Sequence, residues 1–206
     1  MEPVQIVDVP EAVCGVWMPL NRGIMIGTAH GRLMLYPFQD GHIIGDSDSV
    51  HIIDAHDNKI NRIEFNREKT LFITASKDTT AKLFDSRELV CRKIFSTPAP
   101  INHAAISPLF DHVMTGGGQD AKDVTTTSAR QGKFMVRFFH TIYTEEFGRV
   151  KGHFGPVNSV AFHPSGRGFA SGGEDGYVRI HTFDANYFKV SADVDRDINK
   201  AVNMLS

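Results

Sequence analysis

Apolar and polar residues alternate in short runs near the C-terminal end of the chain, and turn residues separate these runs. The alternation predicts three strands, over 157–162, 169–171 and 177–181, because successive side chains of a strand point to opposite faces of a sheet. Two turn sequences interrupt them, His-Pro-Ser-Gly at 163–166 and Glu-Asp-Gly at 174–176. Such short strands with tight turns indicate an antiparallel meander, as in one blade of a β-propeller.

The same pattern recurs earlier in the chain with the same spacing. His153 and Asp175 are separated by 22 positions in the C-terminal unit, and His56 and Asp78 repeat that separation of 22. Looser copies begin further towards the N-terminus and between these two units. We therefore predict an all-β propeller fold with four blades, at about 11–53, 54–95, 96–150 and 151–190, followed by a charged tail over 191–206.

The third unit is longer than the others because a polar segment rich in threonine and serine is inserted at 120–133. Insertions in repeat proteins commonly map to one face of the molecule. Composition leaves two interpretations open, an exposed loop tip without a specific role and a binding loop. The residues that a binding loop would use are Asp123, Thr125, Thr126, Thr127, Arg130 and Lys133.

Charge, apolar runs and cysteine spacing limit the classes of partner and the cellular compartment that we expect for this chain. The chain has 206 residues, and its 22 basic residues are scattered among 24 acidic ones, which gives a formal net charge of -2. That distribution predicts no dedicated nucleic-acid or membrane-binding surface. No apolar run is long enough to span a bilayer, and Cys14 and Cys91 have no metal-type spacing. We expect a cytoplasmic protein without membrane contact, disulfide or metal site.

The repeated histidine and aspartate are candidates for chemistry, but the repeat itself offers a structural explanation. A histidine before the first strand, a hydroxyl residue on the second and an aspartate in the next turn would form a buried hydrogen-bond network that fixes the turn. His56, Ser76 and Asp78 fit this pattern, and so do His153 and Asp175. We therefore predict a structural role for these residues rather than a catalytic one.

No sequence motif supports catalysis. The glycine runs at 116–118 and 172–173 lack the Gly-Lys-Ser/Thr ending of a phosphate-binding loop, so we expect them to serve turns and packing. Nucleophile-elbow, His-Glu-x-x-His and Cys-x-x-Cys motifs are absent from the sequence. We predict a protein that is not an enzyme, needs no cofactor and presents its loops and edges to other proteins.

Four segments carry a resemblance to a known family: Thr74–Ser86, Gly116–Phe134, Arg137–Gly166 and Ser171–Phe188. They closely resemble the i subunit of eukaryotic translation initiation factor 3, a family of WD-repeat proteins, and the resemblance extends back to about Glu11. It implies a WD40-type β-propeller, with four blades present of an expected seven. Another chain would then supply the missing blades, or this sequence is a fragment of a longer protein.

The resemblance also implies a function. Members of the family are scaffold subunits without catalytic activity, which bind the b subunit, chiefly through an α-helix, together with the g subunit, on the small ribosomal subunit. A groove between adjacent blades would accept such a helix through apolar anchors and a charged rim. The candidate contact residues are Lys77, Asp78, Thr79, Thr97, Ala99 and Asn102. Asp78 is also a candidate for the structural network.

A second hypothesis keeps the fold and changes the role. The chain would be a signalling adaptor that docks a kinase or a receptor tail, and Thr125, Thr126, Thr127 and Ser128 would accept phosphate. Phosphate beside Arg130 and Lys133 could order the inserted loop through charge-assisted hydrogen bonds. An enzymatic function is the last of the hypotheses. Only a pocket that contains titratable groups with strongly shifted pKa values would favour it.

Overall fold

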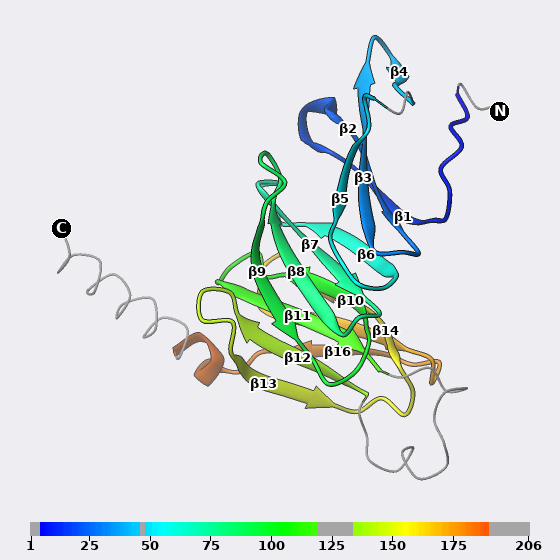
Figure 1. Cartoon of the computed structure of the whole chain (residues 1–206). Helices are drawn as coiled ribbons and strands as arrows, with labels where there is room; N and C mark the ends of the chain where they lie inside the picture. The colour runs from blue at the N-terminus through cyan, green and yellow to red at the C-terminus, as the bar shows by residue number, and fades with distance from the viewer. Residues whose placement is uncertain (1–4, 46–47, 119–133, 190–206) are drawn as a thin grey trace, which may run out of the picture.

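A computed structural model describes residues 5–45, 48–118 and 134–189 of the chain. Within this part, the strands form four antiparallel sheets that follow one another in sequence order (Figure 1). The all-β class predicted from the sequence is therefore confirmed. The candidate loop residues between Asp123 and Lys133 and the predicted tail at 191–206 lie outside the described residues.

Three of the sheets are simple meanders, in which each strand pairs with the next, and the first sheet is a meander with one short strand added. The first contains β1 (Ala12–Trp17), β2 (Gly23–Thr28), β3 (Arg32–Gln39) and β5 (His51–Asp54), with a 3-10 turn at Pro19–Asn21 and the short β4 (His42–Ile43) paired to β3. The second contains β6 (Ile60–Phe65), β7 (Leu71–Ser76), β8 (Thr80–Asp85) and β9 (Cys91–Ser96). The third contains β10 (Ile101–Ile106), β11 (His112–Gly117), β12 (Met135–His140) and β13 (Glu146–Lys151). The fourth contains β14 (Val157–Phe162), β15 (Gly168–Gly173) and β16 (Val178–Thr182).

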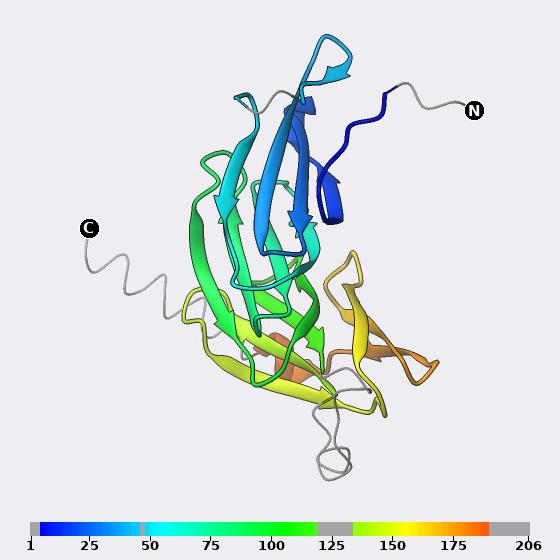
Figure 2. The ribbon, with the colours of Figure 1, turned by 45° about the vertical axis from the view of Figure 1, so that its right-hand side comes forward.

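Contacts between the first strands of the four sheets join neighbouring sheets to one another. β1 packs against β6, β6 against β10, and β10 against β14, so the sheets form a row from the first (blue) to the fourth (orange) in Figure 2. Each of these strands has a register shift near its start, where it pairs with the second strand of its sheet. Because a bulge increases the local twist, the same bulge in all four first strands gives the sheets a common shape.

Apolar side chains fill the space between neighbouring sheets in three clusters. Phe72 and Phe84 stack at 5.1 Å between the first two sheets, and Phe95 contacts Phe139 between the second and third. Phe138 packs with Met114, Val160 and Phe169 between the third and fourth sheets. Full burial of one such side chain contributes about 2 to 3 kcal/mol. Inter-sheet packing therefore provides most of the core, and each sheet depends on its neighbours.

The chain leaves the fourth sheet after three strands, within the described residues, and forms helical residues 185–189 beside the third sheet (Figure 1). Tyr187 of this segment contacts His112 at the start of β11. None of the helical segments in the described part is both long and apolar enough to cross a membrane.

Candidate protein-interaction surface

His56 lies between the first and second sheets and anchors the turn between β7 and β8. Its Nδ1 atom lies 2.8 Å from Asp78 Oδ2, and its Nε2 atom lies 2.7 Å from Thr74 Oγ1. The Thr80 amide and hydroxyl donate to Asp78 Oδ1 at 2.8 and 2.7 Å. Ser76, the predicted partner of His56, instead accepts a hydrogen bond from the Asp78 amide at 3.1 Å. The hydroxyl at Nε2 of the imidazole therefore belongs to Thr74, and the Thr80 hydroxyl lies 3.1 Å from Nδ1.

The fourth sheet contains the same network. His153 Nδ1 lies 3.0 Å from Asp175 Oδ1, and its Nε2 lies 2.8 Å from Ser171 Oγ. Arg179 Nη1 adds a contact of 3.3 Å to Asp175 Oδ2. His181 of β16 stacks on the Phe169 ring with their centroids 4.7 Å apart. We call these two arrangements the His-Asp networks.

Hydrogen bonding keeps both aspartates of the His-Asp networks ionised. Burial alone would raise the pKa of Asp78, but hydrogen bonds from Thr80 and the nearby His56 lower that pKa below its usual value. Burial also opposes ionisation of Asp175, and hydrogen bonds from His153 and two backbone amides outweigh it and lower the pKa. Burial lowers the pKa of His56 against the opposing effect of Asp78. Both ring nitrogens of His56 are occupied, which leaves none for a substrate.

The candidate contact residues lie at the end of the second sheet that carries the β7–β8 turn. Thr79 has a positive φ of 73°, and its carbonyl accepts hydrogen bonds from the Thr97 amide at 2.9 Å and the Thr97 hydroxyl at 3.1 Å. The same hydroxyl lies 2.6 Å from the Ala99 carbonyl. Asn102 belongs to β10 of the third sheet, and its side chain donates to the Val157 carbonyl at 3.2 Å. Five of the six candidates therefore share one end of the second sheet.

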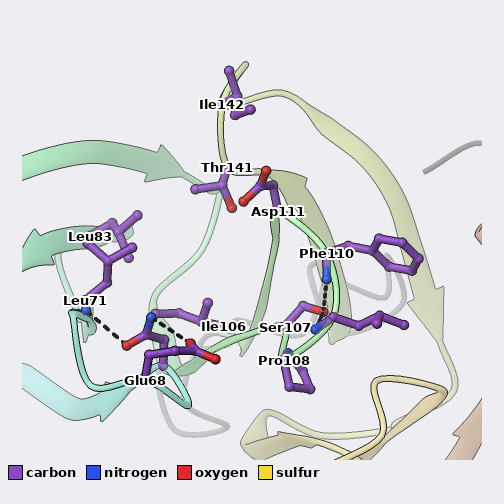
Figure 3. A pocket seen from close by; sticks show the side chains of 12 residues that line it. Glu68, Leu71, Leu83, Ile106, Ser107, Pro108, Phe110, Asp111, Thr141 and Ile142 are labelled. Carbon is purple, nitrogen blue, oxygen red and sulfur yellow. Dashed lines mark hydrogen bonds between the residues drawn. The ribbon is translucent and has the colours of Figure 1, made fainter. Parts of the chain in front are cut away.

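A groove of about 460 Å³ opens between the second and third sheets at the other end of the strands (Figure 3). β7 begins beside the groove at Leu71 and ends at Ser76, next to the β7–β8 turn. The groove walls are the turn before β7, the loop between β10 and β11, and the turn between β12 and β13. Its apolar lining residues are Leu71, Leu83, Ile106, Pro108, Leu109, Phe110 and Ile142. We call this feature the inter-sheet groove.

The rim of the inter-sheet groove is acidic. Glu68 and Asp111 line it from the two facing sheets, both are exposed, and no lysine or arginine is among its described lining residues. The Thr141 hydroxyl is buried next to Asp111 and has no hydrogen-bond partner within the described structure (Figure 3). Leu109 and Ile142 remain 50% and 40% exposed. The groove therefore suits a protein segment with apolar anchors and a positively charged residue.

A second group of side chains with shifted pKa values lies at the outer end of the third sheet. His112 is 5% exposed, and its Nδ1 lies 2.7 Å from the Tyr187 hydroxyl. Burial and the neighbouring His140 lower the pKa of His112 to about 4. Burial raises the pKa of Tyr187. Both groups are therefore neutral at pH 7, and the hydrogen bond between them attaches the helical residues 185–189 to the third sheet.

The His112 pKa predicts acid-sensitive stability. The unfolded chain takes up this proton near pH 6.5, whereas the folded chain takes it up near pH 4, so this contribution to stability is fully present above pH 6.5 and decreases as the pH falls towards 4. The expected loss from pH 7 to pH 4 is about 3 kcal/mol. Urea unfolding followed by circular dichroism measures it, and His112→Phe is the control that should lack this component. Parallel pH profiles for the two proteins would contradict the assignment.

The fold and its two His-Asp networks are consistent with the WD-repeat class of interaction proteins, which use a rigid all-β body to present surfaces to partners. The chain belongs to the EIF3I family, whose model matches residues 3–193. Eukaryotic translation initiation factor 3 subunit I from Xenopus tropicalis is 57% identical over 173 residues, and the protein of that name from Drosophila melanogaster is 53% identical over 174. Each alignment covers 84% of this chain. The family identified from the sequence motifs is therefore confirmed.

These relatives are named as subunits of a translation initiation factor. The chain spans about half the length of these relatives, 51% and 52% of the two proteins.

Proposed function

We propose that this chain acts in the cytoplasm as a scaffold subunit of translation initiation factor 3, without catalytic activity. In this role it binds the b and g subunits and supports assembly on the small ribosomal subunit. The match to the EIF3I family over residues 3–193 carries the proposal. The occupied nitrogens of His56 in its network support the absence of catalysis.

We propose that the four sheets are consecutive blades of a WD40-type propeller of seven blades. The outer faces of the first and last sheets support this arrangement, because Trp17 is 52% exposed on β1 and Val178 and Ile180 are 74% and 82% exposed on β16. Apolar side chains on strands normally pack against a further layer. Further sheets, from another chain or from a longer form of this one, would cover both faces.

We place the helix of the b subunit in the inter-sheet groove. The groove lies between two adjacent sheets, seven of its twelve described lining residues are apolar and its rim carries Glu68 and Asp111, which matches a helix with apolar anchors and one or more basic residues. The candidate residues around the β7–β8 turn remain an alternative position for the same partner. The two positions lie at opposite ends of β7, so mutations can separate them.

Reversing the rim charge is expected to weaken binding of the b subunit. The double variant Glu68→Lys and Asp111→Lys places two cations at the groove, and we expect the dissociation constant for the C-terminal segment of the b subunit to rise at least tenfold. Isothermal titration calorimetry of the full chain with that segment measures the change. Both side chains are exposed, so the circular dichroism spectrum and the unfolding midpoint should stay close to those of the wild type.

Two control variants distinguish binding in the inter-sheet groove from binding at the β7–β8 turn. Glu174→Lys reverses an exposed charge on the fourth sheet and should leave binding unchanged, while Lys77→Glu tests the β7–β8 turn. Loss of binding in Lys77→Glu but not in the groove variant would move the helix to the turn. A tagged chain that retains a kinase or receptor from cell extract, and neither the b nor the g subunit, would favour the signalling adaptor and overturn the scaffold role.

A further inference from the structure

A cavity of about 660 Å³ lies on the outer part of the third sheet, beside the helical residues 185–189. It is distinct from the inter-sheet groove, because the two share no lining residue. Aromatic rings dominate its wall, and they come from β11, β12, the following turn, β13 and the helical segment. These rings belong to His112, His140, Tyr143, Phe147 and Tyr187. We call this feature the aromatic cavity.

The rings of the aromatic cavity form a continuous wall rather than isolated contacts. His112 lies 4.5 Å from Phe147 and 5.3 Å from Tyr187, measured between ring centroids, and His140 lies 4.7 Å from Tyr143. Tyr143 and Phe147 are 52% and 47% exposed, so the cavity opens to solvent on their side. Large aromatic side chains that stay half exposed around a hollow are typical of a binding surface.

Acidic side chains complete the aromatic cavity. Glu145, Glu146 and Asp184 line it, and none of its described lining residues is a lysine or an arginine. Arg137 and Arg149 already pair with Glu146, at 2.7 and 2.8 Å. Asp184 accepts only a backbone amide hydrogen bond among the described contacts, and Glu145 is exposed. The cavity therefore combines π-electron faces with carboxylates that have no cationic partner in the described structure.

We propose that the aromatic cavity binds the cationic end of an arginine side chain from a partner protein. A planar guanidinium can lie against an aromatic face while a nearby carboxylate accepts its hydrogen bonds. The buried walls suit this ligand, because His112 and Tyr187 are uncharged at neutral pH and do not repel a cation. The proposal does not depend on where the b subunit binds, since the inter-sheet groove lies elsewhere.

Titration of the full chain with N-acetyl-arginine methylamide, followed by NMR, tests the proposal. The probe is expected to shift the ring signals of His112, His140 and Tyr187, while the citrulline analogue, which is neutral and nearly identical in shape, binds at least fivefold more weakly. Phe147→Leu and Tyr143→Leu each remove a half-exposed ring, and each should weaken arginine binding at least fivefold. Tyr177→Leu is the matched control, because Tyr177 is also exposed but lies on the fourth sheet.

The outcomes distinguish arginine recognition from a purely structural role of the aromatic cavity. The double variant Glu145→Gln and Asp184→Asn should weaken arginine binding without changing the response to citrulline, because it removes charge and keeps shape. Equal binding of arginine and citrulline, or shifts that persist in both aromatic variants, would overturn the proposal. Absence of any shift in the wild type at 20 mM probe would also overturn the proposal.

Discussion

Replacing Gly31 by alanine is expected to destabilise the chain by about 3 kcal/mol or more. Gly31 has a φ of +81°, and an added Cβ would lie 2.0 Å from the His56 carbonyl oxygen and 2.6 Å from its carbonyl carbon. The Gly31 carbonyl also accepts hydrogen bonds from the Ala55 and His56 amides at 3.1 and 2.9 Å. Relief of the clash would separate the segment before β6 from the β2–β3 turn. Urea unfolding followed by circular dichroism measures the loss.

Gly41 provides a matched control for the Gly31 variant. Its φ is +82°, which is nearly the same backbone conformation, but an added Cβ would meet no atom within 4 Å. Gly41→Ala should therefore cost only the conformational strain of about 1 kcal/mol. The difference between the two variants isolates the clash with His56. Equal losses in the two variants would show that the first two sheets do not approach as closely as the structure describes.

The His-Asp networks were largely predictable from the sequence. The equal spacing of His56–Asp78 and His153–Asp175 fixes which turn each histidine meets, because a meander brings residues at one sequence separation to the same place in every repeat. The choice between Thr74 and Ser76 also follows from the repeat, because the hydroxyl bonded to each histidine lies 18 positions after it, Thr74 after His56 and Ser171 after His153. The counterpart of Ser76 in the fourth sheet is Gly173, which has no hydroxyl. Strand alternation alone does not choose between Thr74 and Ser76, since residues two apart on a strand share a face.

The inter-sheet groove and the aromatic cavity were not predictable from the sequence. The groove combines Glu68 before β7, Leu83 on β8 and Asp111 before β11, and none of these residues stands out in its local segment. The aromatic cavity brings His112 together with Tyr187, which lies 75 positions later in the chain. Such sites depend on how neighbouring sheets and the final helical residues pack, and strand periodicity carries no information on this.

Removing the Asp78 carboxylate is the second change with a large expected effect. Asp78→Ala leaves His56 Nδ1, the Asp57 amide, and the Thr80 amide and hydroxyl without their acceptor. The His56 side chain is fully buried and the Asp78 side chain is 8% exposed, so water cannot fully replace these bonds. We expect a loss of about 2 to 4 kcal/mol, measured by urea unfolding at pH 7.

Asp54→Ala is the matched control, because that carboxylate is 84% exposed and pairs only with Arg32 at 3.1 Å in the described structure. Loss of this exposed ion pair should lower the free energy of unfolding by less than about 1 kcal/mol. The comparison also resolves the two roles suggested for Asp78. If Asp78→Ala lowers stability but the folded variant still binds the b subunit with wild-type affinity, Asp78 serves the His-Asp network alone. Unchanged stability with weakened binding would instead make Asp78 a contact residue, and the network of the second sheet would contribute little to its fold.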